Sequence, residues 1–213
     1  SGSTSNAIVA LNYGIALKAA GNNIVVSNNS WGGSGYSSAL AAAVAAANAA
    51  GIIVVAAAGN ANANNDSTGS YPANYPDVIS VASITSSNAL SSFSNYGANS
   101  VDIAAPGSSI YSTYRGAAYA SLSGTSMATP FVSGAAILLW NAFPEKTLSE
   151  IKAAILNGSD YVPQFEGKIS GARALNLENS LKTLQGIGLP RQQPPPSLTR
   201  GLTYKYYEGK WNK

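Results

Sequence analysis

Ser126 stands in the segment GTSMATP, residues 124–130, at the expected start of an apolar helix over residues 125–141. The free N–H groups and the dipole at a helix N-terminus favour developing negative charge, which a serine nucleophile creates when it attacks a carbonyl. Pro130 is expected in the first turn, where its missing N–H costs little. The alternatives are a simple N-cap serine and the esterase turn G-x-S-x-G, although Ala128 stands where that turn needs a glycine.

Asn60 follows an uninterrupted apolar run, Ile52 to Ala58, and this run predicts a buried central strand of a parallel sheet. Open α/β sheets place their sites at the carboxyl ends of such strands. An Asn amide at that position can donate a hydrogen bond to the oxyanion of a tetrahedral intermediate. A loop Asn that merely caps a turn is the alternative.

A third segment, Asn29-Ser30-Trp31-Gly32-Gly33, follows another expected strand that begins with residues 24–26. The two glycines leave backbone exposed, and an extended peptide can pair with such backbone. Glycines after a strand also form ordinary turns. Each of the three segments is modest evidence for chemistry on its own.

The elements that must position these segments alternate between helix and strand along residues 1–185. This alternation predicts an α/β fold, with a parallel sheet covered by helices on both faces. Helices are expected at 5–20 (capped by Ser5), 38–50, 125–141, 147–157 (capped by Thr147 with Glu150 in a capping box) and 174–184, and strands at 24–26, 52–58, 78–82, 101–104 and 109–113. The helix at 125–141 should be buried, through a face that holds Val132, Ala135, Ala136 and Leu139.

Composition limits the function classes. Hydrophobic residues make up 46% of the 213 residues and charged ones 10%, so a large core is available and the surface is mostly neutral, as in secreted or extracellular proteins. The absence of Cys excludes disulfides and thiolate metal sites. Residues 1–185 carry seven Lys and Arg against eight Asp and Glu, and the later residues five against one. The positive charge therefore belongs to the tail, and we expect neither a nucleic-acid partner nor a membrane span.

Taken together, these segments resemble one family. GTSMATP, NNSWGG, VVAAAGN, SFSNYG and VDIAAPG are similar, in order, to landmarks of the subtilisin-like serine proteases, the subtilases. The resemblance covers about residues 1–185 and would make them the C-terminal two thirds of the catalytic domain. It implies a serine endopeptidase that acts on polypeptides, with Ser126 as nucleophile and Asn60 as side-chain donor of the oxyanion hole. It assigns Ser30, Trp31, Gly32 and Gly33 to one edge of the substrate cleft and of the S1 pocket, and Ala57, Ala58 and Gly59 to the opposite wall.

The sequence departs from the family pattern in two ways. Phe131 stands where many members carry a histidine that is not the catalytic one, and the sequence contains no His at all. In the family, the catalytic Asp and His lie upstream of the first helix seen here. We therefore expect the upstream N-terminal part of the same domain as a partner, and an inert chain in its absence. We also expect an unusually large exposed apolar surface, because the remaining residues cannot cover both the helix at 38–50 and the helix at 125–141.

Two other functions stay open at this point. One is a catalytically inactive, protease-like scaffold that acts as a binding or structural module of a multidomain extracellular protein. The other is an adhesin-like multidomain protein whose protease part only matures its neighbours. The three carboxylates Asp66, Asp77 and Asp102 do not complete a triad without His, and we interpret Asp102 as structural.

Secondary signals concern metal and domains. No cofactor is required, but Asn62, Asn64, Asn65 and Asp66 offer oxygen ligands to a Ca²⁺ ion; because only one of them is charged, a solvated loop is the favoured interpretation. Residues 186–200 predict a Pro-rich linker. Residues 201–213 resemble the opening strand of the carbohydrate-binding module named for anthrax protective antigen, or form an unstructured tail, so a downstream module is expected to start there.

Overall fold

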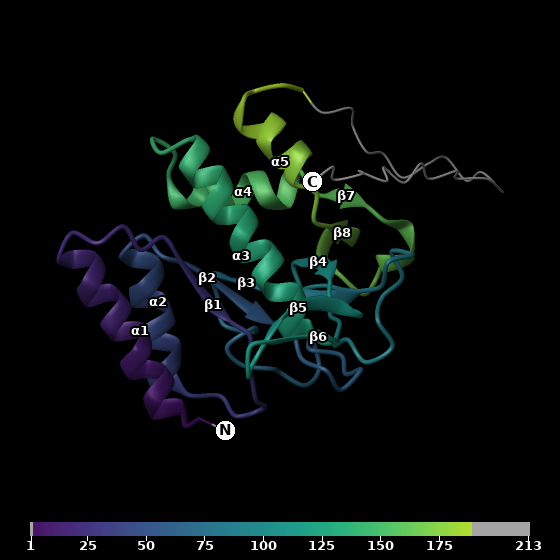
Figure 1. Cartoon of the computed structure of the whole chain (residues 1–213), viewed down its shortest axis with the longest axis horizontal. Coiled ribbons are helices and arrows are strands. Elements are labelled where there is room, and N and C mark those ends of the chain that lie inside the picture. Colours follow the sequence, from purple (N-terminus) through teal and green to yellow (C-terminus); the bar gives the residue numbers. More distant parts are fainter. Residues whose placement is uncertain (1, 189–213) are drawn as a thin grey trace.

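The computed structural model describes residues 2–188, and its centre is a mostly parallel sheet between two layers of helices (Figure 1). The sheet order is β1-β2-β3-β4-β8-β7. Its strands are β1 (Val26–Asn29), β2 (Ile53–Ala57), β3 (Val78–Ile84), β4 (Ile103–Pro106), β8 (Arg173–Ala174) and β7 (Asp160–Tyr161). Only the β7–β8 pair is antiparallel among these. This confirms the predicted α/β architecture, with β2 as an interior strand.

One face of the sheet packs against α3 (Thr125–Ala142) and α4 (Leu148–Asn157). The side chains between these layers are fully buried and come from three strands and both helices: Ile53, Val55, Ile79, Val81, Ile103, Ala128, Val132, Ala136, Leu139, Ile151 and Ile155. Thr147 caps α4, and Glu150 completes the capping box as predicted. α3 packs across β1, β2, β3 and β4. Its first turn lies at the carboxyl end of the sheet, because the N–H of Thr125 donates to Asn60, which follows β2.

The other face packs against α1 (Thr4–Ala19) and α2 (Ser38–Ala49), which lie side by side (Figure 1). Alanines along α2 keep its side chains short, so the helix packs closely on the sheet. Its inner side is buried through Leu40, Ala43, Val44 and Ala47. Farther along the same face, the core continues around Phe165 in the segment that follows β7.

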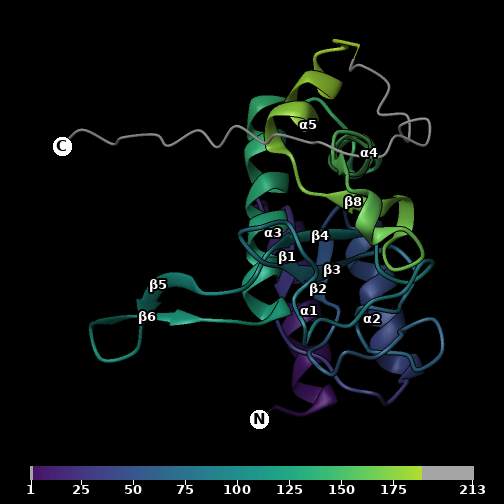
Figure 2. The ribbon, with the colours of Figure 1, turned by 90° about the vertical axis from the view of Figure 1, so that its right-hand side faces the viewer.

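A two-stranded hairpin stands apart from this body. It consists of β5 (Ile110–Tyr114) and β6 (Ala118–Leu122), paired antiparallel, and it projects beyond the start of α3 (Figure 2). Most of its side chains are exposed. The rings of Tyr111 and Tyr119 stack at 5.6 Å between centroids.

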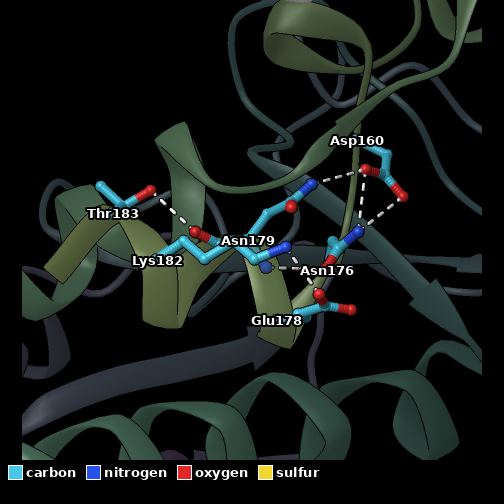
Figure 3. Close-up of polar contacts among 6 residues, drawn as sticks. All are labelled: Asp160, Asn176, Glu178, Asn179, Lys182 and Thr183. Atoms are coloured by element: carbon cyan, nitrogen blue, oxygen red, sulfur yellow. Dashed lines mark hydrogen bonds and ion pairs between the residues drawn. The ribbon is translucent and has the colours of Figure 1, made fainter. Parts of the chain in front are cut away.

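The last described helix, α5 (Leu177–Leu184), is held by a polar cluster (Figure 3). The carboxylate of Asp160 accepts hydrogen bonds from the side-chain amides of Asn176, at 2.9 and 3.1 Å, and of Asn179, at 3.2 Å. Asn176 also caps the helix through the Asn179 N–H. The cluster ties the N-terminus of α5 to β7, far from Ser126 in sequence and outside its pockets.

Several expectations about local structure are wrong in detail. Ser3, rather than Ser5, caps α1, because its side chain accepts from the Asn6 N–H. Pro130 lies in the second turn of α3, since the helix begins at Thr125. The residues at 174–176 form no helix, and the strands β6, β7 and β8 were not predicted.

As expected, the helices at 38–50 and 125–141 are not both covered. The sheet and α1 cover α2, whereas α3 exposes Phe131, Ile137 and Leu138 at 43%, 49% and 58%. Apart from residues 186–188, the expected linker and downstream module lie outside the described residues.

Candidate active site

Ser126 is the second residue of α3, and its hydroxyl donates a hydrogen bond to the Ser30 carbonyl oxygen at 3.0 Å. Gly124 precedes the helix and offers no side chain to cap its first turn. Within residues 2–188, the Ser126 N–H has no acceptor. A free N–H next to a serine hydroxyl at a helix N-terminus is suited to bind an oxyanion that forms on attack.

Asn60 is fixed by the residue that precedes Ser126. Its Oδ1 accepts hydrogen bonds from the N–H and from the hydroxyl of Thr125, both at 2.8 Å. With Oδ1 occupied, the amide Nδ2 is directed away from Thr125 and toward Gly124, where an added Cβ would lie 3.5 Å from it. The hydrogen bonds therefore determine which end of this amide is available as a donor.

The loop that carries Asn60 is anchored below by Asn95. Oδ1 of Asn95 accepts from the N–H groups of Ala61 and Ala63, at 2.8 and 3.1 Å. Between β2 and Asn60, Gly59 has φ +116°, and a Cβ there would lie 2.4 Å from Nδ2 of Asn95. Only glycine fits this close approach. Asn95 belongs to the SFSNYG segment, but its link to the Asn60 loop is not readable from sequence.

Ser126 and Asn60 line one pocket of about 340 Å³. Of the other predicted substrate-binding residues, Trp31, Gly32, Gly33, Ala57 and Gly59 line it as well. The pocket also includes residues that the sequence did not suggest: Ser34, Ala61, Ala63, Thr68, Gly69, Ser70, Asn95 and Thr125. Ser70 lies between the two walls, because its hydroxyl is within 3.5 Å of the positions that Cβ atoms on Gly32 and Gly59 would take.

Two predicted pocket residues have other positions. Ala58 is fully buried, and its carbonyl accepts from the amides of Asn65 and Asn95, so it supports the wall without lining it. Ser30 does not line the pocket but contacts Ser126 through two hydrogen bonds. The exposed backbone expected over residues 29–33 is also shorter than predicted. The Gly33 N–H donates to the Tyr71 carbonyl at 2.9 Å, and the Tyr71 N–H donates to the Gly33 carbonyl at 2.7 Å.

On the opposite side of Ser126 lies a groove of about 410 Å³ between the hairpin and α3. We call it the hairpin groove. It is lined by Ile110, Tyr111, Ser112, Thr113, Ala120, Leu122, Ser126, Met127, Pro130 and Phe131. None of these residues is Asp, Glu, Lys, Arg or His, and Leu122 and Phe131 are more than 40% exposed. The serine therefore faces polar donors on one side and a mainly apolar groove on the other.

Within residues 2–188, the two pockets around Ser126 contain no residue of the kinds that usually serve as its base. Neither pocket around it is lined by Asp, Glu or Lys, and the whole sequence lacks His. Asp66, Asp77 and Asp102 instead line a separate cavity of about 480 Å³. Asp102 accepts from the Ser80 N–H at 2.8 Å, and burial raises the pKa of its carboxyl.

Three of the four candidate calcium ligands, Asn64, Asn65 and Asp66, make hydrogen bonds within the chain. Asn65 turns its amide to the Ala58 carbonyl and its Oδ1 to Asn95. Asn64 Oδ1 accepts from the Asp66 N–H, and Asp66 itself accepts from Ser100 and from the Asn99 backbone. Partial burial opposes ionisation of Asp66, but these hydrogen bonds lower its pKa. Among residues 2–188, no group of three or more His, Cys, Asp or Glu side chains could hold a metal ion.

A protein-family model matches the whole of the described part of the chain. The model of the subtilase family matches residues 1–188. Thermitase of Thermoactinomyces vulgaris is 55% identical over 92 residues, which are 43% of this chain and 32% of thermitase. Subtilisin E of Bacillus subtilis (strain 168) is 43% identical over 96 residues, 45% of this chain and 25% of the relative.

Two solved structures with similar folds are also proteases. A cold-adapted subtilisin-like serine proteinase superposes with a TM-score of 0.73 at 35% identity, covering 82% of this chain and 62% of that one. A protease from Pseudoalteromonas arctica PAMC 21717 superposes with a TM-score of 0.67 at 32% identity, over 75% and 51% of the two chains. The matched regions thus span about a quarter to a third of the curated relatives and somewhat more than half of the solved structures.

Proposed function

This chain belongs to the subtilase family, and from that premise we propose that it supplies the nucleophile and the oxyanion hole of a secreted serine endopeptidase. The observation that carries the proposal is the pair of hydrogen bonds from Thr125 to Asn60 Oδ1. They leave Asn60 Nδ2 and the Ser126 N–H as two free donors beside the Ser126 hydroxyl. An inactive scaffold would have no physical need for this arrangement.

The proposed reaction is acyl transfer. The Ser126 Oγ attacks the carbonyl carbon of the scissile peptide bond while a base removes its proton. The carbonyl oxygen becomes an oxyanion and accepts hydrogen bonds from Asn60 Nδ2 and the Ser126 N–H. The C–N bond then breaks, the amine leaves with a proton returned by the base, and water hydrolyses the Ser126 ester by the same steps in reverse.

The polypeptide substrate would lie along the Trp31–Gly32 backbone, because Gly33 is already paired with Tyr71. The side chain that precedes the scissile bond would enter the pocket of about 340 Å³, between Gly32 and Gly59. Ser70 places a hydroxyl between these walls. The pocket is therefore open to a mid-sized side chain and offers it one polar contact.

The base would come from a segment outside the present sequence, together with the acid that orients it. The hairpin groove supports this assignment, because it begins at Ser126 and is lined mainly by apolar side chains that an added helix could cover. A second hollow, of about 520 Å³, lies beside the outer edge of β1 and is lined by Ile24, Val26, Ile137 and Trp140 among others. In the described sheet β1 is an end strand, so a further parallel strand could pair with it.

Location and partners follow from the same proposal. No helix in the described part of the chain is long and apolar enough to cross a membrane. With few charges on the folded residues and no Cys, we propose an extracellular enzyme that acts on polypeptides and does not bind nucleic acid. Carbohydrate binding by residues 201–213 stays a prediction.

The test is a peptidase assay on the chain joined to the N-terminal third of its domain, encoded by the protein's own gene. We expect hydrolysis of a peptide substrate, and near-complete loss in Ser126→Ala. Ser149→Ala, an exposed serine on α4, is the matched control and should retain full activity. Hydrolysis that survives in Ser126→Ala would contradict the proposal.

A further inference from the structure

The Ser126 carbonyl oxygen lacks its normal partner within the helix. In α3 that partner would be the N–H of residue 130, which is proline and has none. The Ser30 hydroxyl takes the place of this N–H and donates to the Ser126 carbonyl at 2.8 Å. Ser30 is thus bound to the nucleophile twice, because its own carbonyl accepts from the Ser126 hydroxyl at 3.0 Å.

Two more side chains extend this contact into the molecule. Nδ2 of Asn28 donates to the Ser30 hydroxyl at 2.9 Å, and Oδ1 of Asn28 accepts from the Ser133 hydroxyl at 2.8 Å. Asn28 is exposed on β1, whereas Ser133 is buried two turns along α3 from Ser126. The chain of contacts therefore leaves α3 at Ser133, crosses to β1 and returns to α3 at Ser126.

The direction of each hydrogen bond in this chain follows from the one before. A carbonyl oxygen only accepts, so Ser30 must give its single proton to Ser126 and can only accept from Asn28. Asn28 must then present its NH₂ to Ser30, which leaves its oxygen for Ser133. Ser133 also lies 3.2 Å from the Thr129 carbonyl, but the contact with Asn28 is the shorter one. With the Ser133 hydroxyl assigned to its shorter contact, the direction of every hydrogen bond from Ser133 through Asn28 to Ser30 is determined.

We propose that Asn28 and Ser133 are positioning residues for the nucleophile, acting through Ser30. When a base binds the Ser126 hydroxyl, that proton must leave the Ser30 carbonyl, and one of the two bonds to Ser30 is lost. The bond from the Ser30 hydroxyl to the Ser126 carbonyl remains, and it holds the main chain of the nucleophile in place. The relay of Ser133, Asn28 and Ser30 therefore preserves the attack geometry at the step where the direct contact is given up.

This inference rests on the proposed function, and its test starts from the complete protease. Asn28→Leu removes the donor without adding charge, and kcat should fall roughly two- to tenfold, the size expected for one lost hydrogen bond, with KM unchanged. Asn28→Asp keeps the acceptor for Ser133 but cannot donate, so Ser30 should turn to the carboxylate and kcat should again fall. Asn22→Asp is the matched control, because Asn22 is an exposed asparagine that lies outside both pockets around Ser126.

A double-mutant cycle separates a relay from independent effects. Ser133→Ala should lower kcat about two- to threefold in the wild type and have no further effect in Asn28→Leu, because Ser133 acts only through Asn28. Ser133→Thr, which keeps the hydroxyl, should restore kcat. Additive effects, a change in KM alone, or unchanged kcat in both Asn28 variants would overturn the relay. Activity retained in Ser126→Ala would instead overturn the proposed function, and the relay with it.

Discussion

The two sides of Ser126 are built differently. On one side, Thr125, Asn60 and Gly59 are joined by hydrogen bonds between residues of this chain, and two free donors face a polar pocket. On the other side, the hairpin groove is mainly apolar and partly exposed, and it is lined by no titratable group other than a tyrosine. The first side is held by hydrogen bonds within this chain, and the second is a partly exposed apolar surface.

This difference separates two requirements of the same reaction. Stabilising an oxyanion needs only fixed dipoles, which a helix N-terminus and one oriented amide provide locally. Removing the serine proton needs a base with a pKa near the working pH, and in the function proposed here a separate element brings that group in. In this chain, the dipoles come from two segments 65 residues apart in sequence that the sheet brings together.

The largest effect is expected on the polar side. Asn60→Ala in the complete protease should lower kcat by about 10²–10³, the size measured for loss of one such donor in a subtilisin, with little change in KM. The amide acts on the oxyanion, which exists only in the transition state and intermediate. Steady-state kinetics on a peptide substrate measure both parameters. A rise in KM at constant kcat would assign Asn60 to substrate binding instead.

A smaller effect should follow from releasing Asn60 while keeping it in place. Thr125→Val removes the hydroxyl that donates to Asn60 Oδ1 at 2.8 Å and accepts from the Gly59 N–H at 3.2 Å. We expect kcat to fall about tenfold, because the amide keeps only the backbone bond from residue 125. Stability should fall by about 1–2 kcal/mol, since the Gly59 N–H loses its acceptor. Thr125→Ser should retain most of the activity, and equal losses in both variants would contradict this account.

A substitution in the hairpin groove should weaken binding of the N-terminal segment but leave the stability of the isolated chain nearly unchanged. Phe131→Ser should change the free energy of unfolding of the isolated chain by no more than about 0.5 kcal/mol, because the ring is already 43% exposed. Activity reconstituted with limiting N-terminal segment should fall roughly three- to tenfold, since the segment would bury that ring. Val9→Ser, at an exposed position on α1, is the control. A large loss of stability in the isolated chain would show that the groove is part of the core.

The smallest effect on activity is expected at the far end of the molecule. Thr147→Ala removes the cap of α4 and should cost about 1 kcal/mol of stability without changing kcat. The backbone and hydroxyl of Thr147 bind Glu150 and, with Lys146, lower its pKa from 4.5 to about 2. A carboxyl group whose pKa is lowered by folding contributes to stability. This contribution is fully present above pH 4.5 and is lost as the pH falls through 2. The stability difference between the wild type and the variant should therefore narrow as the pH falls toward 2, because protonation of Glu150 removes the bond that the Thr147 hydroxyl donates to the carboxylate.

The sequence could predict the layers of the fold because their signals are local. The apolar run 52–58 and the Ala-rich helix at 38–50 each identify an element without knowledge of its neighbours. The two-residue strands β7 and β8 carry no such pattern, and they form only because β4 offers an edge. The hairpin strand β6 is mostly exposed, so it also lacks a local apolar pattern and was not predicted.

The sequence could predict which residues belong to the candidate site but not the hydrogen bonds between them. Ser126 and Asn60 stand in recognisable segments, and the structure places both in one pocket. The roles of Thr125 and Asn95 depend on hydrogen bonds across 65 and about 33 residues, respectively. Pro130 is a further example. It was expected in the first turn of the helix but lies in the second, and there it leaves the Ser126 carbonyl without the helical N–H partner that the Ser30 hydroxyl replaces.

The central claim is that this chain holds a finished oxyanion side and lacks its base. The most direct measurement is the rate at which a fluorophosphonate modifies Ser126, followed by mass spectrometry, in the chain alone and with the N-terminal segment added. We expect the chain alone to react at about the rate of an ordinary serine, and the added segment to raise that rate by at least about 10³. Equal rates in the two samples would mean that Ser126 does not depend on an external base, and would contradict the claim.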